Sequence, residues 1–252
     1  SHGIIIAAQT KADADRFLEL GANPARTFVT GNIKFDVELE PNIAREGEIL
    51  RGTLFGKRPV WIAASTHDGE EQKVLEAHRT LLKNHPTLLL VLIPRHPERF
   101  AGVHELIARL AFQSVARTER RACDAATEVF LVDTMGEVPL FFAASDIAFV
   151  GGSLVPVGGH NLLEPAAQGL PIVTGPHVFN AQEIAEEFVA LGACRIVANS
   201  AELAATIAEL IDRPDEAEKI GGNGLKMLEQ NRGSLKRLLV LLEPLLANNA
   251  SD

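Results

Sequence analysis

The chain has 252 residues, of which 46% are hydrophobic and 23% are charged, a composition typical of one large folded domain or of one domain with extra segments. Its formal net charge is −9 and it has no strongly basic block, which disfavours a nucleic-acid-binding role. No apolar run is long enough for a membrane span, no secretory leader is expected, and Cys123 and Cys194 lack the spacing of a structural zinc site.

Apolar stretches that favour strands alternate along the chain with amphipathic stretches that favour helices. The expected strands are residues 3–8, 27–30, 59–64, 87–93, 113–116, 129–132, 146–150 and 171–174. The expected helices are residues 11–20, 42–54, 70–84, 97–111, 139–144, 181–191, 201–211, 214–230 and 234–246, with Thr66 or Asp68 as the N-cap of the third. This alternation predicts an α/β fold with a doubly wound parallel sheet.

A glycine-rich loop, residues 151–164, follows the strand at 146–150 and leads into a short helix with Asn161 and Glu164 in its first turn. Glycines let a backbone approach a ligand closely, and free N–H groups at a helix start favour an anion such as phosphate. A carboxylate there can accept hydrogen bonds from the vicinal diol of a ribose. The loop therefore indicates a site for a nucleotide sugar, although glutamate is also a routine choice in a first helical turn.

Polar residues follow three other strands, at 65–71, 94–99 and 133–137. Because the carboxyl ends of parallel strands share one edge of the sheet, these loops and the glycine-rich loop are expected to converge there. Arg95 suits phosphate or carboxylate, and His96 can donate to a phosphate or cap a helix. Glu98 and Arg99 are expected at an exposed helix start.

Several common site motifs are absent from the sequence. There is no G-x-G-x-x-G dinucleotide fingerprint, no P-loop and no G-x-S-x-G nucleophile elbow. His67 and His160 lack metal-ligand spacing, so no metal and no cofactor are expected. Cys123 and Cys194 are expected to be packing residues.

Five motifs occur in an order that resembles the carboxyl-terminal half of the 3-deoxy-D-manno-octulosonic acid (Kdo) transferases. They are GNIKFD at 31–36, STHDGEE at 65–71, PRHPER at 94–99, MGE at 135–137 and GGHNLLEP at 158–165. The resemblance covers about residues 4–245. It implies a GT-B glycosyltransferase with a Rossmann-like carboxyl-terminal domain that binds the donor CMP-Kdo, in an enzyme of lipid A and lipopolysaccharide synthesis.

The resemblance assigns donor contacts to residues of two loops. Arg95 and His96 are expected at the CMP phosphate or at the Kdo carboxylate. Met135, Gly136 and Glu137 are expected at the cytidine, through their backbone and side chains. No metal is needed to bind such a monophosphate donor, since positive and N–H groups can neutralise it.

The glycine-rich loop and the end of the strand at 59–64 supply the other expected donor contacts. Asn161 is expected to position the phosphate or the sugar, and Glu164 to bind the ribose hydroxyls. Gly159, Ser65 and Thr66 complete the expected donor site.

The resemblance also divides the chain into three segments. Residues 1–30 resemble a remnant of the amino-terminal domain and linker, 31–232 the donor-binding domain, and 233–252 a carboxyl-terminal helix and tail. The acceptor site and the catalytic base of the family lie in an amino-terminal half that this chain lacks, so the catalytic residue is unknown and this chain alone is expected to be inactive. The whole enzyme would act at the cytoplasmic face of the bacterial inner membrane, whereas this chain is expected to be soluble.

Two other readings remain open from the sequence. The chain resembles, more distantly, other GT-B glycosyltransferases and UDP-sugar 2-epimerases, which use UDP donors. It would also be compatible with a nucleotide-binding module without chemistry. The expected partners are CMP-Kdo, the lipid A precursor and the amino-terminal domain. Self-association is expected as well, because leucines recur at near-helical spacing over residues 234–246 and form an apolar stripe.

Overall fold

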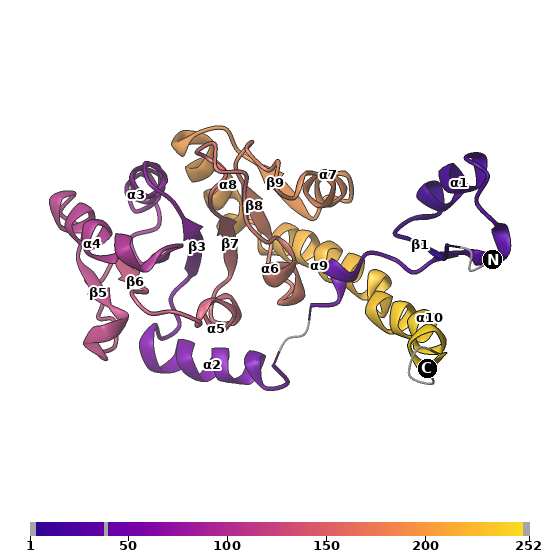
Figure 1. Cartoon of the computed structure of the whole chain (residues 1–252). Coiled ribbons are helices and arrows are strands. Elements are labelled where there is room, and N and C mark those ends of the chain that lie inside the picture. The colour runs from indigo at the N-terminus through magenta and orange to yellow at the C-terminus, as the bar shows by residue number, and fades with distance from the viewer. Residues whose placement is uncertain (1–3, 38–39, 249–252) are drawn as a thin grey trace. The chain divides into compact units, whose positions relative to one another are not determined.

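The computed structural model describes residues 4–37 and 40–248, which form two compact units. Unit 1 is built from the chain up to residue 38 and from residue 226 onward, and unit 2 spans residues 39–225. Figure 1 shows the elements of both units. The family resemblance divides off the residues before 31 and those after 232 as two separate segments. In the structure both segments belong to unit 1.

Unit 2 is organised around a sheet in which every described pair of neighbouring strands is parallel. In spatial order its seven described strands are β5 (Ser114–Ala116), β6 (Val129–Leu131), β4 (Leu89–Pro94), β3 (Val60–Thr66), β7 (Ile147–Val150), β8 (Ile172–Thr174) and β9 (Cys194–Ile196). The doubly wound parallel sheet that the sequence predicts is confirmed. The sequence did not predict β9, which has only three residues, one of them exposed.

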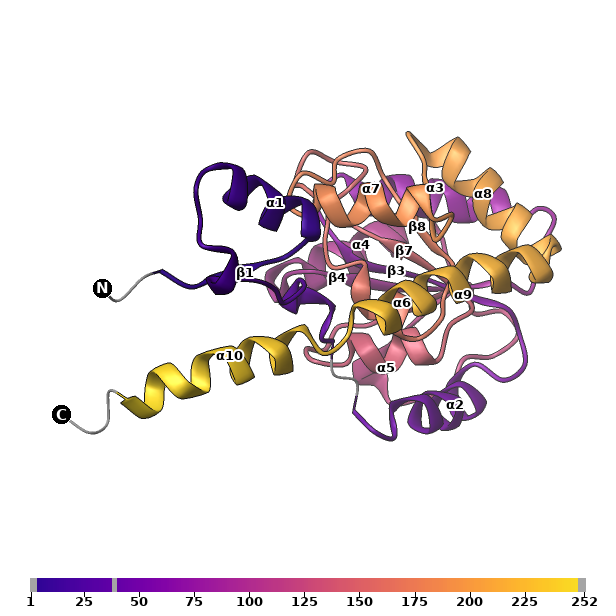
Figure 2. The same cartoon turned by 90° about the vertical axis from the view of Figure 1, so that its right-hand side faces the viewer.

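Helices cover both faces of this sheet, because successive strand side chains point to opposite sides. Trp61 belongs to a core under α3 (Glu70–Leu81), α4 (Phe100–Arg109) and α8 (Ser200–Asp212). Its neighbour Ile62 belongs to a second core under α2 (Ile43–Leu54) and α5 (Val138–Ala143). Figure 2 shows α2 and α5 on one side of the sheet and α3 and α8 on the other.

Three other helices contain residues of unit 2. They are α6 (Leu163–Ala167), α7 (Gln182–Ala190) and α9 (Pro214–Asn231), with single 3-10 turns at Pro24–Arg26, Ile33–Phe35, Pro97–Arg99 and Arg117–Glu119. The boundary between the two units falls within α9. Among the described residues, no helix combines the length and apolar character that crossing a membrane requires.

One polar connection runs through the first core. The Trp61 indole donates to His78 Nδ1 over 3.1 Å, and His78 Nε2 lies 2.9 Å from the carbonyl oxygen of Glu128. A neutral imidazole with its proton on Nε2 satisfies both contacts. Burial lowers the pKa of His78 to about 3, so this ring is neutral when the core is intact.

In unit 1, α1 (Lys11–Glu19) connects two paired parallel strands, β1 (Ile6–Ala8) and β2 (Thr27–Val29). The two oxygens of Asp36 accept hydrogen bonds of 2.5 Å from the N–H groups of Gly233 and Leu235, at the start of α10 (Ser234–Asn248). A carboxylate at a helix amino terminus satisfies otherwise unpaired donors. The motif at 31–36 therefore has a structural role in unit 1, where it holds the start of α10.

Candidate functional site

A cavity of about 470 Å³ lies at the carboxyl edge of the large sheet, where β3 and β7 are neighbours. The chain winds outward from β3 through β4 to the edge strand β5, steps back to β6 and then returns to β7, from which it continues on the other side. This point is therefore a topological switch, the usual ligand position in such sheets. The polar and flexible residues that line the cavity are Ser65, Arg95, Thr134, Met135, Gly136, His160, Asn161 and Glu164. Apolar side chains from the strand ends and from α5 complete its wall.

Ser65 marks an irregularity at the end of β3. Its φ is 58°, and the pairing of β3 with β4 shifts register between Ala64 and Thr66. A bulge and a left-handed serine are costly unless the surrounding structure holds them, and such features cluster at functional sites. The irregularity places Ser65 in the cavity wall while Thr66 is fully buried.

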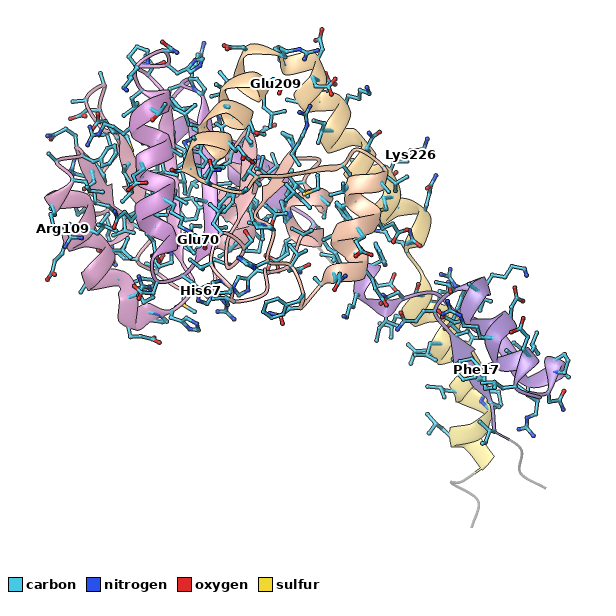
Figure 3. The ribbon with its side chains drawn as sticks, turned by 90° about the horizontal axis from the view of Figure 1, so that it is seen from above. Phe17, His67, Glu70, Arg109, Glu209 and Lys226 are labelled. Atoms are coloured by element: carbon cyan, nitrogen blue, oxygen red, sulfur yellow. The ribbon has the colours of Figure 1, made fainter. Side chains whose placement is uncertain are left out.

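The side chain of Glu70 binds the backbone of the first part of the glycine-rich loop. Its carboxylate is fully buried and accepts hydrogen bonds from the N–H groups of His67 (3.2 Å), Gly152 (2.6 Å), Ser153 (3.0 Å) and Leu154 (2.8 Å). Figure 3 shows Glu70 and His67 at the amino-terminal end of α3. The N–H groups of residues 152–154 are therefore bound inside the protein and are not offered to a ligand.

Gly151 makes this arrangement sterically feasible. A Cβ atom at this position would lie 2.7 Å from Glu70 Oε2 and 2.7 Å from the carbonyl oxygen of Ser65. Both distances are too short for a carbon–oxygen contact, so a larger residue would displace the carboxylate or the end of β3. The glycine thus serves internal packing rather than the approach of a ligand.

The later part of the loop has a different role, because it directs side chains into the cavity. Asn161 Nδ2 donates to Glu164 Oε1 over 3.1 Å, and Asn161 Oδ1 accepts from the N–H of Leu163 over 3.0 Å. The helix α6 begins at Leu163, so Asn161 precedes it rather than lying in its first turn as the sequence suggested. Glu164 does lie in that first turn, and one of its oxygens is oriented by the Asn161 amide.

Arg95 reaches the cavity from the end of β4, and its backbone N–H donates to the carbonyl oxygen of Thr66 over 3.0 Å. Met135 and Gly136 reach it from the loop after β6; Met135 is 58% exposed, and Gly136 has open space around it. The cavity thus has a cationic side chain after the end of β4 and a carboxylate–amide pair at the start of α6. This arrangement can neutralise an anion and accept hydrogen bonds from a diol in one ligand.

Four of the expected site residues lie outside the cavity lining. The Thr66 hydroxyl is buried and donates to Glu71, and Gly159 donates its N–H to the carbonyl oxygen of Gly152 over 2.8 Å. His96 lies beside His67, with ring centroids 5.2 Å apart. The fourth residue is Glu137.

The Glu137 carboxylate accepts from Arg117 over 2.8 Å and from the Thr134 hydroxyl. Its bond with Arg117 is the main reason that its pKa lies below the ordinary value. The side chain is therefore engaged in an internal ion pair at the base of the loop that presents Met135 and Gly136. The expected contact between Glu137 and the cytidine of the donor stays a prediction.

Two expectations for the neighbouring loops are wrong. Neither Thr66 nor Asp68 caps α3, because Gly69 occupies the N-cap position with a φ of 75°. Arg99 is not an exposed helix-start residue: it bridges the buried carboxylate of Glu71 at 3.0 Å and Asp68 at 2.8 Å. Burial raises the pKa of Glu71 against the opposing effect of Arg99. The ion pair joins the start of α3 to the 3-10 turn at Pro97–Arg99.

The sequence did not reveal the contact between His67 and His160, whose Nε2 atoms lie 2.7 Å apart. These residues are 93 positions apart, and no spacing rule connects them. Among the described residues, no three histidine, cysteine, aspartate or glutamate side chains gather in a way that could hold a metal ion.

Comparison with known proteins relates both units to glycosyltransferases. Residues 58–227 match the family model "Glycosyl transferases group 1", and residues 3–37 match the model "3-Deoxy-D-manno-octulosonic-acid transferase (kdotransferase)". The solved carboxyl-terminal CMP-Kdo binding domain of WaaA from Acinetobacter baumannii is similar, with a TM-score of 0.70 and 36% identity. The match covers 74% of this chain and 97% of that domain.

Two curated relatives are similar over nearly the whole chain. The 3-deoxy-D-manno-octulosonic acid transferase of Haemophilus influenzae is 42% identical over 97% of this chain, and that of Bordetella pertussis is 36% identical over 94% of it. These matches take in 58% and 56% of the relatives' own length. The chain thus spans little more than half the length of these relatives.

Proposed function

Because the chain belongs to the Kdo transferase family of glycosyltransferases, we propose that it binds the donor CMP-Kdo in the cavity between the ends of β3, β4 and β7. The observation that carries this proposal is the convergence of Arg95, Asn161 and Glu164 on one cavity at the topological switch point. Its volume of about 470 Å³ is within the range of small-ligand sites.

In this proposal the Glu164 carboxylate accepts hydrogen bonds from the two ribose hydroxyls. Asn161 already binds one oxygen of Glu164, which fixes the plane of the carboxylate and leaves the other oxygen for the diol. The cytosine ring lies against the loop that carries Met135 and Gly136, where the absence of a side chain at Gly136 leaves the backbone accessible.

Arg95 neutralises the phosphate or the Kdo carboxylate, with His96 and His160 as additional nitrogen donors nearby. During transfer the bond between the phosphate oxygen and the anomeric carbon of Kdo breaks, and negative charge grows on the departing CMP. A guanidinium at the cavity wall stabilises that charge more in the transition state than in the bound donor. We therefore propose that donor binding requires neither a metal nor a cofactor.

The nucleotide preference is the direct test of this proposal. Titration of the chain with CMP, CMP-Kdo and UDP by calorimetry should give binding to the two cytidine compounds and much weaker binding to UDP. Preference for UDP would favour a different GT-B glycosyltransferase or an epimerase. Binding without transfer, even when the rest of a Kdo transferase is added, would favour a module without chemistry.

We further propose that the complete reaction attaches Kdo to a lipid A precursor at the cytoplasmic face of the inner membrane, where a lipid acceptor and a nucleotide sugar meet. Transfer needs donor, acceptor and base in one place, and much of the rate gain comes from that positioning. Since this chain spans 58% of its Haemophilus relative, we expect it to bind the donor without turning it over. Turnover of CMP-Kdo with lipid A precursor by this polypeptide would contradict that expectation.

Self-association also stays a prediction. Leu235, Leu239, Val240 and Leu246 of α10 are exposed in the structure, and the side chain of Leu245 lies outside the described part of the chain. Exposed apolar side chains on one helix favour association with a second surface. Sedimentation at increasing concentration should show a rising mean mass, and a strict monomer would exclude this role.

A further inference from the structure

His67 and His160 form a contact with unusual geometry at the edge of the cavity. Their Nε2 atoms lie 2.7 Å apart, their rings are parallel to within 5°, and the ring centroids are 5.0 Å apart. Because the centroids are much farther apart than the nitrogens, the two rings meet edge to edge in nearly one plane. A hydrogen bond between the nitrogens then aligns the N–H of one ring with the lone pair of the other.

The surrounding backbone holds this pair in place. A Cβ atom at Gly152 would lie 2.9 Å from His160 Cδ2 and 3.4 Å from His67 Cδ2, so a larger residue there would displace a ring. The buried Glu70 carboxylate accepts from the N–H of His67 and from the N–H of Gly152, which ties both sides of the contact to one group. His160 lines the cavity, whereas His67 is not among the lining residues and contacts His160.

The contact allows only two protonation states. A hydrogen bond between two Nε2 atoms contains one proton, so the rings are either both neutral or share a single positive charge. Two imidazolium rings would point N–H groups at each other and break the contact. The pair therefore behaves as a coupled unit that can gain one proton.

The environment of the pair disfavours the uptake of this additional proton. The charged and titratable side chains on the surrounding elements are Asp68, Glu70, Glu71, Lys73, Arg95, His96, Glu98, Arg99, Glu164 and His177. Burial, followed by His67, Arg95 and His96, lowers the pKa of His160 to about 4. Burial, followed by His96, Arg95 and Arg99, also lowers the pKa of His67. Glu70 and Glu71 offset this little, because their oxygens are bound by backbone N–H groups and by Arg99.

We propose that the His67–His160 pair takes up one proton when an anionic group binds beside His160, with His67 as the positioning residue that shares the proton. An anion at this place compensates the cations that keep the pair neutral, so the charged form becomes favourable. The pair would then add one positive charge to the site only while the anion is present. This inference rests on the proposed nucleotide-sugar function, since it needs an anion in the cavity.

The test uses the methyl phosphodiester of CMP, which carries one negative charge that does not titrate near neutral pH. Calorimetry at pH 6.5 in two buffers with different protonation enthalpies gives the number of protons taken up on binding. We expect uptake approaching one proton, and an affinity that falls by up to about tenfold per pH unit as the pH rises. Cytidine, which lacks the phosphate, should bind without uptake.

Three variants show which histidine is needed for the proton uptake. His67→Asn should remove most of the uptake and flatten the pH dependence while the nucleotide still binds. His96→Asn should weaken binding, because His96 is a proposed donor to the anion, but should retain the uptake per bound ligand. The control His104→Asn, on the exposed face of α4, should change neither. Unchanged uptake in His67→Asn, or binding of the phosphodiester with no uptake in the unaltered chain, would overturn the proposal.

A second measurement separates this proposal from the proposed function. Imidazole nitrogen NMR of the free chain should show His67 and His160 titrating together by a single proton, and His67→Asn should leave His160 titrating as a single uncoupled ring. Independent titration of both rings would overturn the paired unit whether or not any nucleotide binds. Failure of cytidine nucleotides to bind, with the paired titration intact, would contradict the proposed function, and sulfate, which does not titrate near neutral pH, would then serve as the anion for the uptake measurement.

Discussion

The two ends of the glycine-rich loop both offer hydrogen-bonding groups, but the groups at one end serve the fold and those at the other end face the cavity. Residues 152–154 donate their N–H groups to the carboxylate of Glu70, which lies inside the protein. Residues 160, 161 and 164 present side chains to the cavity. The first end is an anion site that the protein fills itself, and the second is open to a ligand. A loop rich in glycine therefore need not bind ligand along its whole length, because part of it can be fixed by an internal anion so that the rest is positioned.

The strongest way to break this comparison is to remove the internal anion. Glu70→Gln keeps the size of the side chain but replaces one acceptor oxygen by an N–H₂ group that faces N–H donors. Since these donors are buried, we expect a loss of about 3 kcal/mol in the free energy of unfolding, measured by urea denaturation. The control Glu76→Gln alters an exposed carboxylate on the same helix and should change stability by less than about 0.5 kcal/mol. Equal stabilities of the two variants would show that Glu70 does not hold the loop.

A steric change tests the same end of the loop. Gly151→Ala places a methyl group 2.7 Å from a Glu70 oxygen and from the Ser65 carbonyl oxygen, and we expect a loss of about 2 kcal/mol in the free energy of unfolding. Gly102→Ala is the matched control, because this helical glycine has open space around it and alanine favours helix. Its stability should rise by about 0.5–1 kcal/mol. Thermal unfolding that ranks the two variants in the opposite order would contradict the packing argument.

The pH dependence of the free energy of unfolding tests a buried group of the molecule. His78 has its pKa lowered to about 3 in the folded chain, whereas an unfolded histidine titrates near 6.5. The unfolded state then binds more protons, so stability is full above about pH 6.5 and declines as the pH falls toward the folded value. We expect a loss of about 2 kcal/mol from this residue between pH 7.5 and 5.

The measurement is the free energy of unfolding as a function of pH. His78→Phe lowers stability at every pH, since the Trp61 indole loses its acceptor, but it should flatten the slope between pH 7.5 and 5. A variant with the same slope as the unaltered chain would show that the acid sensitivity arises elsewhere.

The open end of the loop should respond in binding rather than in stability. Glu164→Gln removes the charge that strengthens hydrogen bonds to a ribose diol, and we expect CMP binding to weaken by about 1–2 kcal/mol, measured by calorimetry. Glu183→Gln is the control, since Glu183 is an exposed carboxylate in the first turn of α7 that lies outside the cavity lining. Undiminished CMP affinity in Glu164→Gln would remove the ribose role.

Much of the fold follows from the sequence because the buried strands are continuous apolar runs. β3, β4, β7 and β8 each have uninterrupted or nearly uninterrupted burial, and each was predicted within a few residues. β9 was missed because three residues with an arginine in the middle give no such run. The cap of α3 was misassigned because a left-handed glycine can start a helix without a side-chain acceptor, which polar neighbours conceal.

The site was predictable where a polar residue belongs to the connection that follows a strand. Arg95, Asn161 and Glu164 meet at the cavity as the topology requires. The role of Glu70 was not predictable, since a glutamate in a first helical turn ordinarily faces solvent and interacts with the helix dipole. The Glu70 carboxylate reaches backbone amides that lie 82–84 positions further along the chain only because β7 pairs with β3 in space.

The central claim is that the open end of the glycine-rich loop, and not its internally filled end, belongs to a cytidine nucleotide site. Backbone NMR shift mapping during a CMP titration tests this directly. The account predicts saturable shifts at Gly136, Asn161 and Glu164, with much smaller shifts at the Glu70-bound amides of Gly152, Ser153 and Leu154. Saturable shifts confined to the opposite edge of the sheet, or none at Asn161 and Glu164, would contradict it.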